Sequence, residues 1–123
     1  MSEHSPAPRG PRLVIVGAGK MGGAVLRGAL AAGALRADEV AIFHPDSKRL
    51  AALSEEYGVA GVDDAGLHDA KNVLLAVKPQ SFAKVAPIVA QRHASFISLM
   101  AGVTAESIAR RVGSMRVIRA MPN

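Results

Sequence analysis

Residues 13–22, LVIVGAGKMG, give the clearest indication of the fold. Its first four residues are continuously aliphatic, which is typical of a central parallel strand that is covered on both faces. The glycines that follow have the spacing G-x-G-x-x-G, and the residues after them have the apolar periodicity of a helix. A strand, this motif and a helix in direct succession predict a turn that binds the pyrophosphate of a dinucleotide.

Each glycine of this motif has a separate expected role. Gly17 permits the tight turn, Gly19 lets the pyrophosphate approach the backbone, and Gly22 lets the helix pack closely against the strand. Backbone amides and the positive end of the helix dipole attract the anion, so the charge of Lys20 is not required and this lysine can be a solvated surface residue. The alternative interpretation of the glycines is a tight turn that holds no ligand.

The rest of the chain alternates short aliphatic runs with amphipathic stretches, which predicts βαβ units and a parallel sheet. We expect six strands, at residues 13–16, 40–43, 59–62, 73–77, 96–99 and 116–120. We expect helices at residues 19–32, 46–57, 63–68, 79–92 and 104–112, the first with Met21, Val25, Ala29 and Leu30 facing inward. This pattern predicts a single α/β domain over residues 12–123, a doubly wound Rossmann fold with a mainly parallel sheet in the order 3-2-1-4-5-6. Residues 1–11, which are polar and rich in proline, are expected to be a disordered tail.

Composition argues against several classes of function. The net charge of +5 is spread along the chain, and with three phenylalanines, one tyrosine and no recognizable nucleic-acid motif we expect no nucleic-acid partner. The apolar stretches are too short to span a bilayer, so we expect no membrane partner. The histidines have no metal-like spacing, so we expect no metal site. The absence of cysteine is consistent with a cytoplasmic protein.

The end of the second predicted strand bears on the choice between NADH and NADPH. NAD-binding sites place an acidic residue there, about 20 residues beyond the glycines, to hold the ribose hydroxyls. This chain has His44 at the tip, followed by Ser47, Lys48 and Arg49 at the start of a helix, a set that can hold a 2′-phosphate. We therefore expect NADPH to be preferred, with NADH possible. In the alternative interpretation the two basic residues lie on an ordinary helix surface, and Asp46 only caps the helix.

Three further segments narrow the class: LAVKP at residues 75–79, MAGVT at residues 100–104 and VIRAMPN at residues 117–123. Together with the glycine motif, in this order and spacing, they resemble the amino-terminal part of pyrroline-5-carboxylate reductase, and the resemblance covers residues 12–123. It implies an NAD(P)-dependent oxidoreductase of proline biosynthesis, which transfers a hydride from a nicotinamide cofactor to the C=N bond of 1-pyrroline-5-carboxylate and gives L-proline.

The resemblance also adds residues to the expected cofactor site. It places residues 76–79 and 100–102 beside the ribose and nicotinamide, and by a looser correspondence it adds Asp64. No catalytic residue or proton donor is assigned. The cofactor-binding residues expected from the motifs and the resemblance together are Gly17, Ala18, Gly19, Lys20, Met21, Gly22, His44, Ser47, Lys48, Arg49, Asp64, Ala76, Val77, Lys78, Pro79, Met100, Ala101 and Gly102.

The length of the chain departs from the family pattern. Members of that family continue into a helical second domain, which forms dimers or larger homo-oligomers and completes the imino-acid site. We therefore expect this chain to be one half of a longer protein, able to bind cofactor but with very weak turnover or none alone. Two alternatives stay open: a nucleotide-sensing Rossmann module without catalysis, and a related β-hydroxyacid or imine reductase.

Overall fold

The structure is a computed structural model that describes residues 11–17 and 19–120, with the backbone alone at residues 64 and 65. Its six strands are β1 (Leu13–Val16), β2 (Val40–Phe43), β3 (Ala60–Gly61), β4 (Asn72–Leu75), β5 (Ser95–Ser98) and β6 (Val117–Arg119). Its helices are α1 (Lys20–Ala31), α2 (Ser47–Tyr57), α3 (Asp64–His68), α4 (Phe82–Val89) and α5 (Ala105–Val112), with 3-10 turns η1 (Ala37–Glu39) and η2 (Pro79–Ser81).

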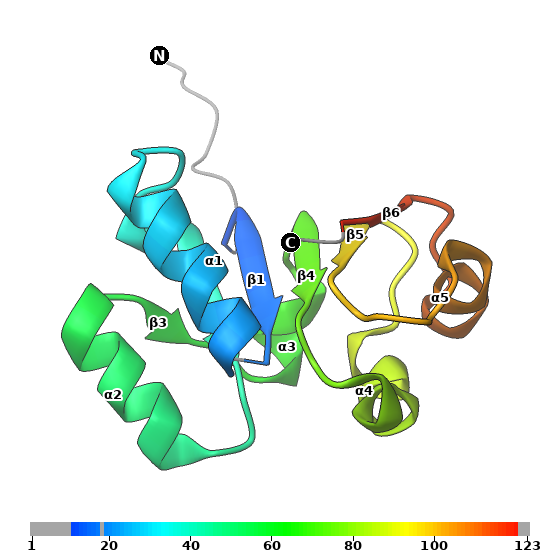
Figure 1. Ribbon diagram of the computed structural model, residues 1–123, viewed down its shortest axis with the longest axis horizontal. Helices are drawn as coiled ribbons and strands as arrows, with labels where there is room; N and C mark the ends of the chain where they lie inside the picture. Colours follow the sequence, from blue (N-terminus) through cyan, green and yellow to red (C-terminus); the bar gives the residue numbers. More distant parts are fainter. Residues whose placement is uncertain (1–10, 18, 121–123) are drawn as a thin grey trace, which may run out of the picture.

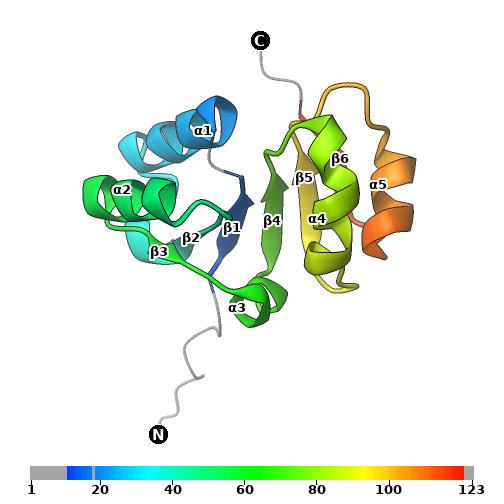
Figure 2. The ribbon, with the colours of Figure 1, turned by 90° about the horizontal axis from the view of Figure 1, so that it is seen from below.

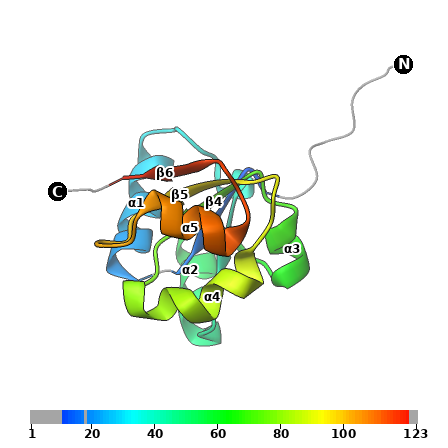
Figure 3. The ribbon, with the colours of Figure 1, turned by 90° about the vertical axis from the view of Figure 1, so that its right-hand side faces the viewer.

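The strands form one sheet in the order β3-β2-β1-β4-β5-β6, and every neighbouring pair is parallel. This confirms the predicted doubly wound order, with β1 between β2 and β4, and with β6 along one outer edge (Figure 3). The chain runs outward from β1 in one direction and then, from β4 onward, in the other. Ligands of such sheets bind at this point of reversal, outside the carboxyl ends of the strands.

Helices cover both faces of the sheet because the central strands are apolar on both (Figure 1, Figure 2). In β1, Val14 and Val16 pack into the cluster that includes α3, α4 and α5, whereas Ile15 packs into the cluster that includes α1 and α2. All three side chains are at most 1% exposed. Successive side chains of this aliphatic strand point to opposite faces of the sheet and therefore contribute to two separate cores, as expected for parallel strands.

Local sequence fixes several helix ends. Asp46, Asp63 and Thr104 each accept a hydrogen bond from a backbone amide in the first turn of α2, α3 and α5. Gly58 takes a left-handed conformation at the end of α2, with φ of 72°, and Gly33 has the same φ just beyond α1. None of the helices within the described residues is long and apolar enough to cross a membrane.

Several predicted elements are shorter in the structure, and the third strand and the fourth helix differ most clearly. The third strand keeps only two of its four expected residues, although the Val62 amide still donates to the Ile42 carbonyl at 3.0 Å before Asp63 starts α3. The helix expected at residues 79–92 begins as η2 and ends at Val89. Its last part is replaced by a contact with the end of α5, where the Gln91 amide donates to the Val112 carbonyl.

The inward face of α1 also differs from the prediction. Met21 was expected to face inward, but its side chain is 42% exposed. The buried positions of α1 are Gly22, Gly23 and Leu26, and Leu26 is 1% exposed. Val25 and Leu30 pack against the core as predicted. The prediction was wrong for Met21, because α1 meets the turn through Gly22, which a search for large apolar residues overlooks.

Candidate functional site

The turn between β1 and α1 requires glycine at its first position. Gly17 has a φ of +90°, which side chains rarely tolerate, and its amide donates to the Phe43 carbonyl at 3.0 Å. A Cβ at this position would lie 2.9 Å from the Ala76 carbonyl oxygen and 3.0 Å from Val77 Cγ1. Gly17 therefore brings the ends of β1, β2 and β4 together.

The other two glycines of the motif differ in their surroundings. A Cβ at Gly22 would collide with the carbonyl oxygen of Gly17, so this residue sets the close packing of α1 against the turn. A Cβ at Gly19 would meet nothing within 4 Å, and its φ of −75° is open to any residue. Within the described chain, nothing in the packing demands glycine at position 19, and the space beside it is open.

The start of α1 suits an anion. Among the described residues no side chain caps this helix or α4, in contrast to α2, α3 and α5, and the first turn of α1 contains no acidic residue. The first amides of a helix need partners, and a bound phosphate can supply them. The open side of Gly19 and the uncapped helix therefore fit the pyrophosphate of a dinucleotide.

The tip of β2 is built from short local hydrogen bonds. The Asp46 amide donates to His44 Nδ1 at 2.9 Å, which orients the imidazole, and Asp46 Oδ1 accepts from the amides of Lys48 and Arg49 at 3.0 and 3.3 Å. The carboxylate of Asp46 therefore serves as the cap of α2. The side chains of Ser47, Lys48 and Arg49 are exposed at the same corner.

A hollow of about 250 Å³ lies beside the glycine turn, at the carboxyl ends of β1, β2 and β4. It brings together two of the predicted regions, the glycine turn with His44 and the segment after β4. Its walls are mostly apolar, as is usual for a cofactor pocket. The lining residues are Val16, Gly17, Gly19, Phe43, His44, Pro45, Ala76, Val77, Lys78, Ser81 and Val85.

Five of these lining residues were absent from the prediction: Val16, Phe43, Pro45, Ser81 and Val85. Phe43 is the last residue of β2, and the position alone could have indicated it, because strand ends border the site. Ser81 and Val85 are four residues apart, one turn along η2 and α4, and so lie on one side of that segment. Recognizing them would have required knowing which side faces the turn.

The loop after β5 contributes to a second hollow, of about 380 Å³, between the starts of α4 and α5. Pro79 and Gly102 meet there, together with Thr104, Ser107 and Arg111. The structure thus separates the predicted residues of the β4 segment between two hollows.

The remaining predicted residues lie elsewhere. The side chain of Met100 is 1% exposed in the core, so only its backbone faces the loop, and Ala101 is exposed in the turn. Lys20 and Met21 are exposed on the first turn of α1 and line neither hollow. Ala18 and the side chain of Asp64 lie outside the described residues.

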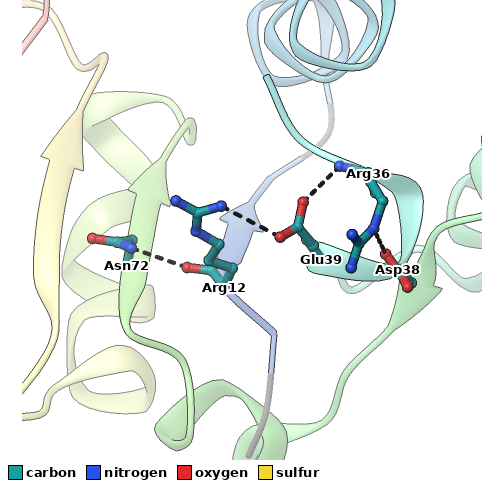
Figure 4. Close-up of polar contacts among 5 residues, drawn as sticks. All are labelled: Arg12, Arg36, Asp38, Glu39 and Asn72. Atoms are coloured by element: carbon teal, nitrogen blue, oxygen red, sulfur yellow. Dashed lines mark hydrogen bonds and ion pairs between the residues drawn. The ribbon is translucent and has the colours of Figure 1, made fainter. Parts of the chain in front are cut away.

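A charged cluster occupies the opposite edge of the sheet, at the amino ends of β1, β2 and β4 (Figure 4). The carboxylate of Glu39 accepts from the Arg36 amide at 2.8 Å and from the Arg12 guanidinium at 3.3 Å. The first of these bonds is the main cause that lowers the pKa of Glu39 below its ordinary value. The Asn72 side-chain amide donates to the Arg12 carbonyl at 3.0 Å and joins β4 to the cluster. This cluster ties strand ends together far from the glycine turn.

Groups of three or more potential metal ligands are absent from the part of the chain that the structure describes.

The sheet order and the glycine turn at its point of reversal define the class of the protein: it is an NAD(P)-binding Rossmann domain. Residues 12–102 match the family model described as NADP oxidoreductase, coenzyme F420-dependent. Because this match covers well over half of the chain, the protein belongs to that family.

Individual relatives agree with this assignment. A pyrroline-5-carboxylate reductase from Thermus thermophilus is 44% identical over 112 residues, which cover 91% of this chain and 43% of that protein. The solved pyrroline-5-carboxylate reductase from Coxiella burnetii has a TM-score of 0.78 and 29% identity, covering 92% of this chain and 44% of the other. The Plasmodium falciparum pyrroline carboxylate reductase, solved with NADP bound, has a TM-score of 0.77 and 20% identity, covering 95% of this chain and 44% of the other. At this identity the likeness shows the fold alone. The chain therefore spans less than half the length of the relatives it matches.

Proposed function

We propose that residues 12–123 form the NAD(P)-binding domain of a pyrroline-5-carboxylate reductase. The cofactor, when bound, supplies the hydride that reduces the C=N bond of 1-pyrroline-5-carboxylate to give L-proline. The observation that carries the proposal is the open side of Gly19 beside an uncapped helix, in a chain 44% identical to a curated reductase of that name.

In this proposal the chain binds and orients the dinucleotide. Gly19 and the first amides of α1 hold the pyrophosphate, and the apolar wall formed by Phe43, Ala76 and Val77 excludes water from the bound nucleotide. The backbone around Gly102 extends the site toward β5. The imino acid is expected to bind only when the remaining part of the protein completes the pocket, and homo-oligomers are expected for the whole protein.

We further propose that NADPH is preferred over NADH. The carboxylate of Asp46 would be the natural partner of the ribose hydroxyls of NADH, but it is bonded to the backbone of its own helix. Its bonds also occupy two amides that a phosphate would otherwise use. A 2′-phosphate would therefore depend on side chains, and Ser47, Lys48 and Arg49 are exposed at that corner.

A double substitution tests this preference. Lys48→Ala with Arg49→Ala should weaken NADPH binding by about tenfold or more, since charge-assisted hydrogen bonds to phosphate are lost, and should leave NADH affinity nearly unchanged. The matched control is Lys84→Ala with Arg110→Ala, which removes the same charges from α4 and α5. Equal NADPH affinities for the two double variants would refute the preference.

The reaction needs a test with the rest of the enzyme present. A chimera can be made in which residues 12–123 replace the matching part of the Thermus thermophilus reductase. It should oxidise NADPH when 1-pyrroline-5-carboxylate is supplied, and the Gly19→Ala chimera should need an NADPH concentration at least about tenfold higher for the same rate. A folded chimera that binds NADPH without turnover would contradict the proposed reaction and would favour a nucleotide-sensing domain.

A further inference from the structure

The second hollow lies between α4 and α5, which are neighbours on one face of the sheet (Figure 2). Its volume of about 380 Å³ is within the range of small-molecule sites. It shares no lining residue with the hollow beside the glycine turn. The glycine turn and its hollow therefore do not account for this space.

The two walls of the second hollow differ in their chemistry. On the α4 side, Pro79 and Phe82 are apolar, and Phe82 is anchored in the core with 3% of its surface exposed. On the other side, Thr104, Ser107 and Arg111 are three or four residues apart along α5 and its cap, so they lie on one face of that helix. A ligand that fits both walls has an apolar body and a polar group directed at α5.

The wall formed by α5 offers hydrogen-bond donors and one positive charge. Thr104 Oγ1 accepts from the Ser107 amide at 3.0 Å, which leaves the hydroxyl proton of Thr104 available as a donor. The Ser107 hydroxyl and the Arg111 guanidinium make no hydrogen bond or ion pair with any residue that the structure describes. The residues that line the hollow include no aspartate or glutamate. Donors around a single unpaired cation favour a ligand with one negative charge.

The preceding residue of α5 provides a useful comparison. Arg110 is also exposed, but its guanidinium is paired with Glu106 at 3.3 Å, one turn away, and it does not line the hollow. Arg111 lines the hollow and has no such acidic neighbour there. Its planar guanidinium matches a carboxylate through paired hydrogen bonds. Because Thr104 already caps the start of α5, side chains rather than helix amides would hold the anion.

We propose that the second hollow is a binding site for a small carboxylate with an apolar body, separate from the dinucleotide site. The carboxylate pairs with Arg111 and accepts hydrogen bonds from Thr104 and Ser107, and the apolar body lies against Pro79 and Phe82. This inference goes beyond the proposed function and does not depend on it, because no residue of the glycine turn takes part.

Benzoate is a suitable probe, and benzamide, which has nearly the same shape without the charge, is its matched control. Amide NMR of the isotope-labelled 123-residue chain should show saturable shifts at Gly102, Val103 and Ser107 when benzoate is added. Benzamide should bind at least about fivefold more weakly, and Arg111→Gln should weaken benzoate binding by a similar factor, since the charge-assisted bonds are lost. Arg110→Gln should leave the benzoate dissociation constant within about twofold, because Arg110 lies outside the hollow.

The outcomes also separate this inference from the proposed function. The carboxylate site is refuted if benzoate causes no saturable shifts at these residues, if benzamide binds equally well, or if Arg111→Gln leaves the affinity unchanged. NADPH at saturation should leave the benzoate dissociation constant within about twofold, whereas competition between the two would show that the hollow is part of the dinucleotide site. Binding of NADPH without binding of benzoate would overturn this inference alone. Arg111 is exposed, so its substitution tests binding without disturbing the core.

Discussion

Gly19 and Gly22 lie three residues apart in one turn, yet a methyl group would meet different surroundings at the two positions. At Gly22 it would strike the Gly17 carbonyl, and at Gly19 it would enter open space. The G-x-G-x-x-G spacing predicted the close packing at Gly22, which the structure confirms, whereas the approach of the pyrophosphate to Gly19 stays a prediction. The separate hollows of the β4 and β5 loops could not be predicted, because they depend on how η2 and α4 pack beyond the strand ends.

The close contact at Gly22 leads to a prediction about stability. Gly22→Ala should lower the free energy of unfolding by about 1–3 kcal/mol, because the methyl group forces α1 away from the turn. Gly28→Ala, in the same helix and in open space, should raise it by up to about 1 kcal/mol. Urea unfolding of the two variants measures both effects. Equal effects of the two substitutions would show that the contact with Gly17 has no energetic role.

Among the secondary-structure elements, some helices begin with a side chain that accepts a hydrogen bond from the first turn, and others do not. The helices α2, α3 and α5 begin after aspartate or threonine, which are favoured at such positions, and these side chains accept hydrogen bonds from the first turn. Neither α1 nor α4 has a side-chain cap, and α1 differs from α4 in following the glycine turn, with open space beside Gly19. Element ends were predicted less well where tertiary contacts decide them, as at Val89 and in β3.

The cap of α2 can be tested apart from its charge. Asp46→Ala should lower the free energy of unfolding by about 1 kcal/mol, because two amides of the first turn lose their acceptor. Asp46→Asn should change it little, since asparagine is an equally good cap. Thermal or urea unfolding gives the comparison. Equal losses for the two variants would mean that the negative charge, and not the cap, stabilises the helix.

The 3-10 turn η1 makes stability depend on pH. Glu39 has a pKa held below its ordinary value of 4.5, chiefly by the hydrogen bond from the Arg36 amide. A carboxyl group with a lowered pKa in the folded state contributes stability above its unfolded pKa, and this contribution is lost as the pH falls through the folded pKa. Glu39→Gln should therefore be less stable than the wild type at pH 7, and the difference should shrink below about pH 4.5. A difference that is constant from pH 7 to pH 3 in urea unfolding would contradict this account.

At the scale of the whole molecule, the sheet separates two cores that the sequence predicts well. Continuous aliphatic strands at β1 and β4 and amphipathic stretches between strands indicate both the parallel sheet and its two covered faces. The sequence could not reveal how evenly each strand is covered. The inner strands are buried, but at the edge strand β6 the side chain of Ile118 is 63% exposed.

Because Ile108 is buried and Ile118 is exposed, substitution of isoleucine by valine should change the unfolding free energy by different amounts at the two positions. Ile108→Val should cost about 1 kcal/mol of unfolding free energy, because Ile108 is 0% exposed among α4, α5 and the sheet. Ile118→Val should stay within about 0.5 kcal/mol of the wild type. Urea denaturation compares the two, and a similar cost at both positions would show that β6 is covered in solution.

Binding of a dinucleotide at the glycine turn can be measured by calorimetric titration of the 123-residue chain and its Gly19→Ala variant with NADPH. We expect the chain to bind NADPH at one site. We expect the variant to keep the unfolding free energy of the wild type within about 0.5 kcal/mol but to bind NADPH at least about tenfold more weakly, because its methyl group enters the space left for the pyrophosphate. Equal NADPH affinities for the two proteins, or no binding by a fully folded wild type, would show that the glycine turn is not a dinucleotide site.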